Sequence, residues 1–432
     1  MLAAVANSLG QNVDDSAPSF STLRRMREKN RLKSAEELKK SIKIQAPLTV
    51  HWDSKLMPSG SGRKLIDRLP VIVTNSDKVE QLLQAPAISS SSGKQMGIAV
   101  FESLKNWNLE KIICGMGFDT TISNTGNKNG ACVLLQKIIM KDLLYFACRH
   151  HIFELVLEAC FSMCMPSSSG PNIQLFQRFQ KNWNMLKRSQ PRDDYKELLD
   201  LVLTFIGHNK KPTFRAPGAF HRARWMAKAI YVLKIFMFQT QFALTRVEKK
   251  SLSRIASFIV STYVFGWFEA PFPIRAPEND VRFLKRLLSY EKVDPEVAQA
   301  AIKKFSGHLW YLGEEMIFLS LFDNRVDEKT KKQMVEVFKT GNPCFVKENL
   351  TPIESRKIKA IVCKSDIENL RLEHFVSARS IRFFEILNID SKWLLEIDPM
   401  KWEDDKSYQD AKHVVKSGQR CCRKGGFLGP KI

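Results

Sequence analysis

The chain has 432 residues, and its 67 Lys and Arg against 45 Asp and Glu give a formal net charge of +22. The length suggests roughly two to three domains, and 44% hydrophobic with 26% charged residues excludes a wholly disordered or collagen-like chain. The positive excess favours a polyanion as partner, because Lys and Arg displace counterions from phosphates. We therefore expect DNA as the partner, with an anionic membrane surface or a merely basic soluble protein as alternatives.

Three features predict an intracellular protein. Residues 1–10 lack the basic region of a signal peptide, and no apolar run reaches the ~20 residues of a membrane span. The nine cysteines are odd in number and irregularly spaced, which is typical of reduced thiols. We expect no membrane partner and, with DNA as the partner, a nuclear location. A homo-oligomer is left open.

In chain order, the sequence predicts an α/β core followed by a helical domain. A charged helix is expected over 21–43, in a lead-in segment spanning 1–45. An α/β core over 46–165 is expected to contain strands at 48–57, 69–75 and 111–119 and helices at 97–107 and 130–147. An all-helical domain over 166–350 follows, and a mixed segment over 351–432 ends in a basic tail. After the core, helices are expected at 152–163, 174–189, 194–206, 219–246, 250–265, 279–290, 295–306 and 308–322.

Two aspartates end predicted strands of the core. A period of two places Asp53 on the polar side of a half-buried strand, and Asp119 follows a strand whose glycines permit close approach of a neighbour or ligand. Two carboxylates on adjacent strands can hold divalent metal ions for phosphodiester chemistry. The alternative is that each aspartate only caps the turn after its strand.

The segment after Asp119 resembles a known family. FDTTISNTGNKNGACVLLQKIIMKDLLYFACRHH begins at the strand end, passes through a helix and arrives at Cys148-Arg149-His150-His151. This layout resembles the RNase H-like core of hAT-family DNA transposases, in which a Cys-x-x-His motif opens a helix after the second catalytic aspartate. The resemblance implies an RNase H-like mixed sheet interrupted by a large helical insertion. Asp53 and Asp119 would then be catalytic ligands of Mg²⁺ or Mn²⁺, with Cys148 and His151 supporting the sheet.

The resemblance extends to HRARWMAKAIYVL at 221–233, which is similar to the Arg-Trp block that opens the family's insertion. Arg222, Arg224 and Trp225 are therefore expected to bind DNA, with Trp225 stacking on an extruded base. A core tryptophan flanked by solvated arginines is the alternative. A zinc cluster formed by Cys148, His151 and two later cysteines, Cys160 and Cys164, is also considered. The offsets along one helix are too long for one tetrahedral centre, so we expect no structural zinc.

The third carboxylate of the family's site is not evident. In the family it belongs to a C-terminal Glu-Arg block, and here Gln419-Arg420 stands in its place. Glutamine cannot supply the negative charge that a second metal ion requires. In place of that glutamate we expect Glu315, and secondarily Glu314, both in the predicted helix 308–322, to supply the third carboxylate. The alternative is that the two glutamates form a buried hydrogen-bonded pair that ties two insertion helices.

These observations predict a transposon-derived protein that binds DNA without sequence preference, since residues 1–113 contain no cysteine for a zinc finger. Its cut-and-paste activity is expected to be impaired. One alternative is an active metal-dependent transposase or nuclease that uses Asp53, Asp119 and Glu315. A second is a non-enzymatic helical scaffold for protein contacts.

Overall fold

The structure is a computed structural model and describes residues 19–41, 47–58, 65–75, 80–165, 173–182, 194–207, 225–340 and 364–417. The chain divides into two compact units, Met1–Gln45 and Ala46–Ile432. The first unit contains the helix α3 (Phe20–Ser41), where the sequence predicts a charged helix. Its side chains are exposed from Phe20 to Lys39, as its low apolar content leads one to expect.

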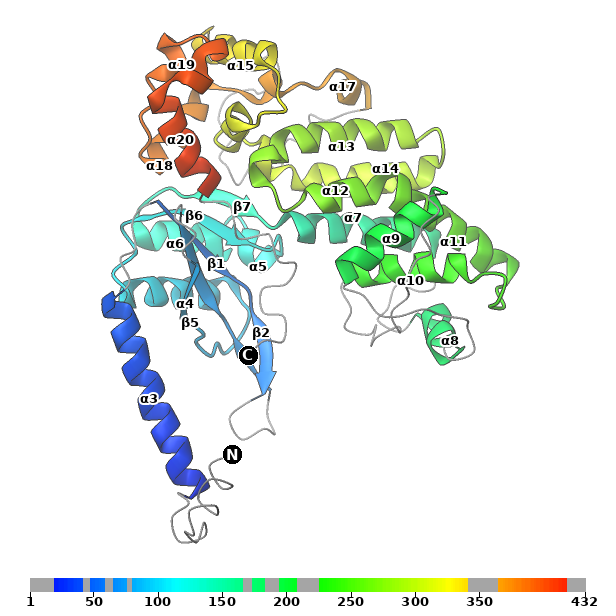
Figure 1. Cartoon of the computed structure of the whole chain (residues 1–432), viewed down its shortest axis with the longest axis horizontal. Coiled ribbons are helices and arrows are strands. Elements are labelled where there is room, and N and C mark those ends of the chain that lie inside the picture. The colour runs from blue at the N-terminus through cyan, green and yellow to red at the C-terminus, as the bar shows by residue number, and fades with distance from the viewer. Residues whose placement is uncertain are drawn as a thin grey trace, which may run out of the picture. The chain divides into compact units, whose positions relative to one another are not determined.

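The second unit contains a five-stranded mixed sheet, which confirms the predicted α/β class (Figure 1). The strand order is β5-β4-β1-β6-β7, with β1 antiparallel to β4 and parallel to β6, and β6 parallel to β7. The helices α4 and α6 pack against each other beside the sheet. The bounds are β1 (Leu48–Trp52), β4 (Val71–Asn75), β5 (Glu80–Gln84), α4 (Gly93–Asn106), β6 (Ile113–Phe118), α5 (Ile122–Thr125), α6 (Ala131–Ile139) and β7 (Leu144–Ala147). A separate hairpin pairs β2 (Lys55–Pro58) with β3 (Leu65–Arg68).

The sheet differs from the sequence prediction in four respects. The single strand predicted over 48–57 forms two strands, β1 and β2, and β2 belongs to the separate hairpin. β1 is buried along its whole length, not half-buried, and as a central strand it pairs at both edges with β4 and β6. The helix predicted over 130–147 ends at Ile139, and the last residues of that range form the strand β7. The strand β5 was not predicted, since its sequence, EQLLQ, lacks β-branched residues.

Two glycines of β6 are explained by close packing across strands. An added Cβ at Gly117 would lie 1.9 Å from Nδ1 of His51 in β1, and one at Gly115 would lie 2.7 Å from the Phe146 ring in β7. Only glycine leaves room for these two rings beside the central strands. The predicted close approach is therefore made by neighbouring side chains.

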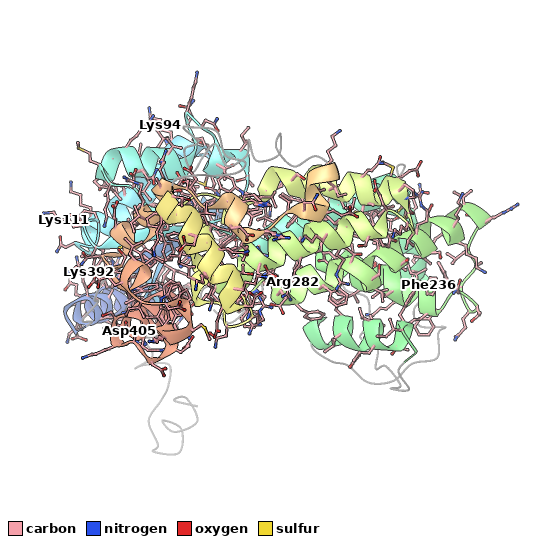
Figure 2. The ribbon with its side chains drawn as sticks, turned by 90° about the horizontal axis from the view of Figure 1, so that it is seen from above. Lys94, Lys111, Phe236, Arg282, Lys392 and Asp405 are labelled. Atoms are coloured by element: carbon pink, nitrogen blue, oxygen red, sulfur yellow. The ribbon has the colours of Figure 1, made fainter. Side chains whose placement is uncertain are left out.

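A helical region follows β7 along the chain (Figure 1). Its helices are α7 (Arg149–Cys164), α8 (Gln174–Asn182), α9 (Asp194–Phe205), α10 (Trp225–Met237), α11 (Arg246–Phe258), the π-helix η4 (Ile259–Tyr263), α12 (Val264–Glu269), the 3₁₀ turn η5 (Pro273–Arg275), α13 (Ala276–Tyr290) and α14 (Pro295–Phe305). Aromatic pairs such as Phe153 with Phe283, whose centroids are 5.0 Å apart, fill its interior. Phe236, which is labelled in Figure 2, is partly exposed and pairs with Phe205 at 4.9 Å between centroids. None of the helices described is long and apolar enough to span a membrane.

Capping residues set several of these helix ends. The predicted start at Asp294-Pro295 is confirmed, because the Asp294 side chain accepts a hydrogen bond from the Val297 N–H and Pro295 is the first helical residue. The single helix predicted over 219–246 is wrong at its end. It stops at Met237, and a capping box of Thr245 and Glu248 starts the next helix.

The helix predicted over 308–322 is also wrong. The chain forms three short 3₁₀ segments, η6 (Ser306–His308), η7 (Trp310–Leu312) and η8 (Met316–Phe322). Gly313 interrupts the run in an extended conformation, at φ −67° and ψ 155°. Apolar content therefore buries this segment without making it one α-helix.

The C-terminal part of the described chain packs around an aromatic cluster. Phe322 stacks on Tyr408 at 5.4 Å between ring centroids, and Trp393 meets Trp402 edge-on at 4.9 Å. Such pairs contribute about 0.5–1.5 kcal/mol each beyond the area they bury. The elements are α15 (Glu328–Thr340), α17 (Lys364–Asn369), η10 (Leu372–Phe375), η11 (Ala378–Ile381), α18 (Arg382–Leu387), α19 (Trp393–Glu396), η12 (Pro399–Asp404) and α20 (Lys406–Ser417).

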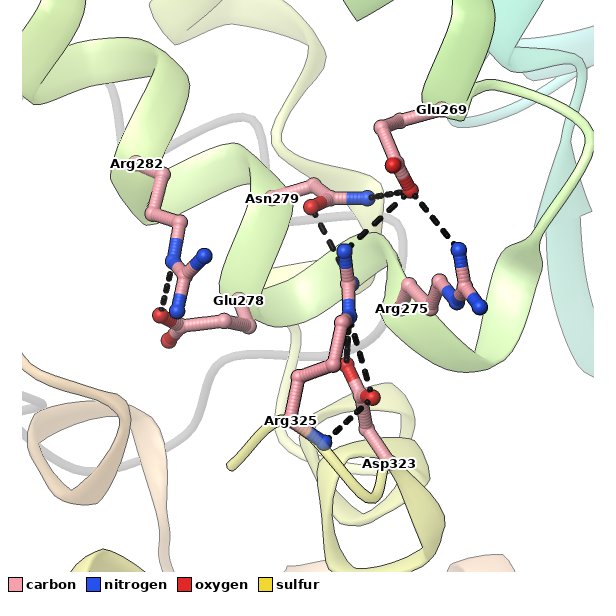
Figure 3. A network of polar contacts seen from close by, with 7 residues as sticks. All are labelled: Glu269, Arg275, Glu278, Asn279, Arg282, Asp323 and Arg325. Carbon is pink, nitrogen blue, oxygen red and sulfur yellow. Dashed lines mark hydrogen bonds and ion pairs between the residues drawn. The ribbon is translucent and has the colours of Figure 1, made fainter. Parts of the chain in front are cut away.

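A polar network joins the end of η8 to helices α12 and α13 (Figure 3). The Arg325 guanidinium donates to the buried Asp323 at 3.0 Å, to Glu269 at 3.3 Å and to the Asn279 carbonyl at 3.2 Å. The neighbouring Arg275 pairs with the same Glu269 carboxylate at 3.4 Å. The network therefore ties the segment after η8 to the helical region by charge-assisted hydrogen bonds.

Candidate functional site

Three parallel strands end at one edge of the sheet, and each is followed at once by a chemically distinctive residue. Asp53 follows β1, Asp119 follows β6 and Cys148 follows β7. The register pairs His51 with Gly117 and Phe118 with Ala147. Extended past the strand ends, it brings Asp53 opposite Asp119 and Asp119 opposite Cys148. Neighbouring strands lie about 4.8 Å apart, and the carboxyl ends of parallel strands are the usual ligand edge of an α/β sheet.

The Asp119 carboxylate is fixed through one of its oxygens. Oδ1 accepts hydrogen bonds from the Thr121 N–H at 3.1 Å, from the Thr121 hydroxyl at 2.6 Å and from the Asn124 amide at 2.7 Å. This is the turn-capping role considered as the alternative for such an aspartate. Oδ2 accepts no hydrogen bond from any residue that the structure describes. The capping role therefore orients the carboxylate and leaves one oxygen for another partner.

Asn124 couples the two strand ends and was not predicted as a site residue. Its side chain is buried, it accepts a hydrogen bond from the Trp52 indole at 2.8 Å, and it donates to Asp119. Trp52 immediately precedes Asp53, so one amide holds both strand ends in place. The signal in the sequence is the Asx-rich run after the strand, DTTISN, in which a polar side chain folds back on the turn.

His51 lies behind the edge, within β1. It is buried, and its Nε2 lies 2.9 Å from the hydroxyl of Thr74 in β4. Burial lowers the pKa of His51 to about 3, so the ring is neutral at physiological pH. His51 therefore adds no positive charge beneath the two aspartates, and its role is to pack over Gly117.

The Cys148–His151 motif opens α7. Cys148 is the N-cap of this helix, and its N–H donates to the Phe118 carbonyl at 2.8 Å, which continues the ladder beyond β7. His151 follows one turn along, on the same side of the helix. The next residue of the motif, His150, is buried edge-on against Trp267 at 4.5 Å between centroids. The motif thus joins the end of the sheet to the first helix of the helical region.

Arg149 is the buried charge of this motif, and sequence reasoning gave it no role. Its guanidinium donates to Asp280 of α13 at 2.5 Å, with side chains 2% and 1% exposed, and lies 5.3 Å from the Phe153 and Tyr311 ring centroids. Burial raises the pKa of Asp280 to about 6, while the adjacent Arg149 opposes that rise. The pair ties the start of α7 to α13.

Glu314 and Glu315 face a cation from the C-terminal segment. Arg379 of η11 lies 3.4 Å from a Glu314 carboxylate oxygen and 3.5 Å from one of Glu315. Burial raises the pKa of both carboxyls, and Arg379 lowers it. The helix predicted over 308–322 would have placed Glu315 on one face with His308 and Tyr311, and that prediction is wrong, because no α-helix connects them. The buried pair considered as the alternative exists in altered form, since it ties η7 and η8 to η11 and not to a second insertion helix.

Glu315 also borders a small cavity of about 170 Å³ beside β7. Tyr145 of β7 and Trp310 of η7 line it, with parallel rings 6.0 Å apart. Leu143 and Leu144, also in its wall, lie at the start of β7, whereas Cys148 and the carboxyl edge follow its end. The cavity is therefore built around the beginning of the edge strand.

The remaining predicted site residues are placed only in part. Arg222, Arg224 and Gln419 lie outside the described residues, and Trp225 is the first residue of α10. Cys160 and Cys164 are buried in α7, where burial raises the pKa of the Cys164 thiol to about 12. Within the described part of the chain, no group of three or more His, Cys, Asp or Glu side chains is placed to hold a metal ion.

Compared with known proteins, the sequence matches no family model and no curated protein.

Proposed function

We propose that the chain is a transposase-derived DNA-binding protein with an RNase H-like core and impaired cut-and-paste activity. The observation that carries the proposal is the placement of Asp53 and Asp119 directly after β1 and β6, which are adjacent and parallel. Extended by two residues, the register brings Asp53 beside Asp119 at the carboxyl edge of the parallel strands, where ligands of α/β sheets usually bind.

The order of elements around this edge supports the resemblance to hAT transposases. Asp119 ends β6, the helix α6 and the strand β7 follow, and Cys148 then opens a long helix with His151 one turn along. A run of helices, α7 to α14, separates the sheet from the C-terminal segment. These features match part of the layout that the resemblance implies, and among the described residues every strand precedes this run of helices.

The carboxylates available for a metal ion argue for impaired catalysis. Asp53 and Asp119 are suitable oxygen donors for Mg²⁺ or Mn²⁺. The third acid of the family's site has no evident counterpart, because Glu314 and Glu315 are buried against Arg379. The described residues therefore do not fit the family's set of three acids, and we derive no chemical step through a metal ion.

Binding without sequence preference follows from the charge. A net charge of +22 provides phosphate affinity, which positions a protein on DNA without reading bases. The affinity of such binding falls steeply as the salt concentration rises. This salt dependence of DNA binding distinguishes the proposal from the alternative of a helical scaffold for protein contacts.

The test combines DNA binding with cleavage. The purified full-length chain is incubated with end-labelled duplex and hairpin DNA in Mg²⁺ or Mn²⁺. We expect salt-sensitive binding of unrelated sequences and no cleavage above background, with Asp119→Asn and the exposed-site control Asp410→Asn indistinguishable from wild type. Metal-dependent nicking that Asp53→Asn, Asp119→Asn and Glu315→Gln abolish, and Asp410→Asn does not, would instead establish an active nuclease. Absence of DNA binding at low salt would overturn the proposal.

A further inference from the structure

The helix α11 presents three cations on one exposed face. Arg246, Lys249 and Lys250 are exposed and occupy positions i, i+3 and i+4, which share a face. Ser253 and Ser257 continue the same stripe along the helix. These five side chains line an open groove of about 600 Å³, which we call the α11 groove.

Residues from the adjoining end of α13 form the opposite wall of the α11 groove. They are Tyr290, which ends α13, and Val293 and Asp294, which precede α14. Val293 is 66% exposed, so the wall is open to a large partner. The groove is therefore a surface between two packed helices that an extended ligand can reach.

The carboxylates near the α11 groove are already paired with other arginines. Glu248 pairs with Arg178 at 2.8 Å, and Arg254 pairs with Asp294 at 2.6 Å and with Glu296 at 2.7 Å. No carboxylate in the described ranges pairs with the three cations of the groove. Like charges at these spacings repel, so the fold gains nothing from clustering them. A polyanion in the groove would relieve that repulsion.

We propose that the α11 groove binds the phosphodiester backbone of duplex DNA, an inference that rests on the proposed function. At 1.5 Å of rise per residue, Arg246 and Lys250 are about 6 Å apart along the helix and the whole stripe extends about 16 Å. One strand of B-DNA carries a charge about every 3.4 Å along its axis, so the stripe faces several phosphates. The two serine hydroxyls add donors of the kind that contact phosphate oxygens.

The experiment compares two variants with the same change in net charge. Arg246→Gln/Lys249→Gln/Lys250→Gln removes the three cations of the groove that pair with no carboxylate of the described chain, and leaves Arg254, which also lines it but pairs with Asp294 and Glu296. The control Lys392→Gln/Lys401→Gln/Lys406→Gln removes three exposed lysines from the C-terminal segment, of which Lys392 is labelled in Figure 2. The full chain and both variants are titrated with two fluorescent 30-base-pair duplexes of unrelated sequence over a series of KCl concentrations, with circular dichroism as the check of folding.

We expect the groove variant to lose affinity by about tenfold or more for both duplexes and to reduce the slope of log K against log salt by about 2–3. The control variant should keep the wild-type slope. A second variant, Ser253→Asp/Ser257→Asp, keeps the cations but places negative charge in the groove, and it should weaken binding at low salt.

The outcomes separate the two proposals. Wild-type binding that the groove variant retains with an unchanged slope would overturn the groove assignment and leave the proposed function standing. A wild-type chain that binds no duplex at low salt would overturn both. If polyglutamate binds the groove more tightly than duplex at equal salt, and the groove variant alone loses it, the groove is a site for acidic proteins and the DNA assignment is wrong.

Discussion

The buried ion pair between Arg149 and Asp280 gives the sharpest prediction about stability. Arg149→Met keeps an unbranched side chain of similar length but leaves Asp280 buried without its cation. Breaking a buried pair in this way costs about 3–5 kcal/mol, because an uncompensated charge stays in an apolar interior. The matched control is Arg178→Met, which breaks the more exposed pair with Glu248. That change should cost less than about 1 kcal/mol.

The cost of Arg149→Met should depend on pH. Burial raises the pKa of Asp280 from 3.8 to about 6, so its contribution to stability is present below pH 4 and is lost as pH rises through about 6. A shift of that size corresponds to about 3 kcal/mol. Removing Arg149 removes the influence that lowers this pKa, so the carboxyl binds a proton at higher pH. The variant should therefore lose most stability near pH 8 and less near pH 5.

Urea unfolding at pH 5 and pH 8, followed by tryptophan fluorescence, measures these differences. The double variant Arg149→Met/Asp280→Asn should recover a large part of the loss at pH 8 and little at pH 5, because it removes the stranded charge. A loss at pH 8 no larger than that of Arg178→Met, or a loss of equal size at both pH values, would refute the reasoning.

Three further changes test the packing and the site. Gly117→Ala places a Cβ 1.9 Å from the His51 ring and should lower the free energy of unfolding by about 3 kcal/mol. The control Gly207→Ala, at φ +88° with open space around it, should lower it by about 1 kcal/mol. Equal urea midpoints for the two variants would contradict this. Asn124→Leu removes the hydrogen-bond partner of the Trp52 indole N–H and of the Asp119 carboxylate, and it should lower the free energy of unfolding by about 1–3 kcal/mol. An unchanged urea midpoint would show that the Asn124 amide does not position these groups. Because burial raises the pKa of Glu315 above 4.5, its stabilising contribution is present below that pH and is lost as pH rises. Glu315→Gln should therefore flatten the thermal-stability profile above pH 4.5, and an unchanged profile would count against the assignment.

The sequence predicted the parts of the fold that local signals determine. The β-branched runs gave β1 and β4, the alternating apolar residues of 111–119 gave β6, and the Asp294-Pro295 signal marked the start of α14. The strand β7 was missed because its four apolar residues, LYFA, follow a helix and carry no turn signal strong enough to separate them. Short apolar runs of this kind become strands only through the neighbour they pair with, here β6.

The sequence could predict the site residues whose position depends only on where a strand ends. Asp53 and Asp119 each follow a recognisable strand, so their place at the sheet edge could be inferred from the sequence. The partners of Arg149 and Glu315 could not, since Asp280 lies 131 residues beyond Arg149 and Arg379 lies 64 residues beyond Glu315. Pairing over such separations depends on tertiary packing, which no local pattern encodes.

The acidic residues of this protein differ in the groups that contact their carboxylates, and this difference indicates which of them could serve a function. Asp280 and Glu315 are buried, and each has an arginine within 3.5 Å, so both side chains take part in contacts between packed segments of the fold. Asp119 is oriented by hydroxyl, amide and backbone N–H donors, and no Lys or Arg pairs with it among the residues described here. A carboxylate held in place by neutral donors is not neutralised by a cation of the protein and can bind one from outside it. Asp119 is therefore the acid whose substitution reports on a metal-dependent activity, whereas substitution of Glu315 reports first on the docking of the C-terminal segment.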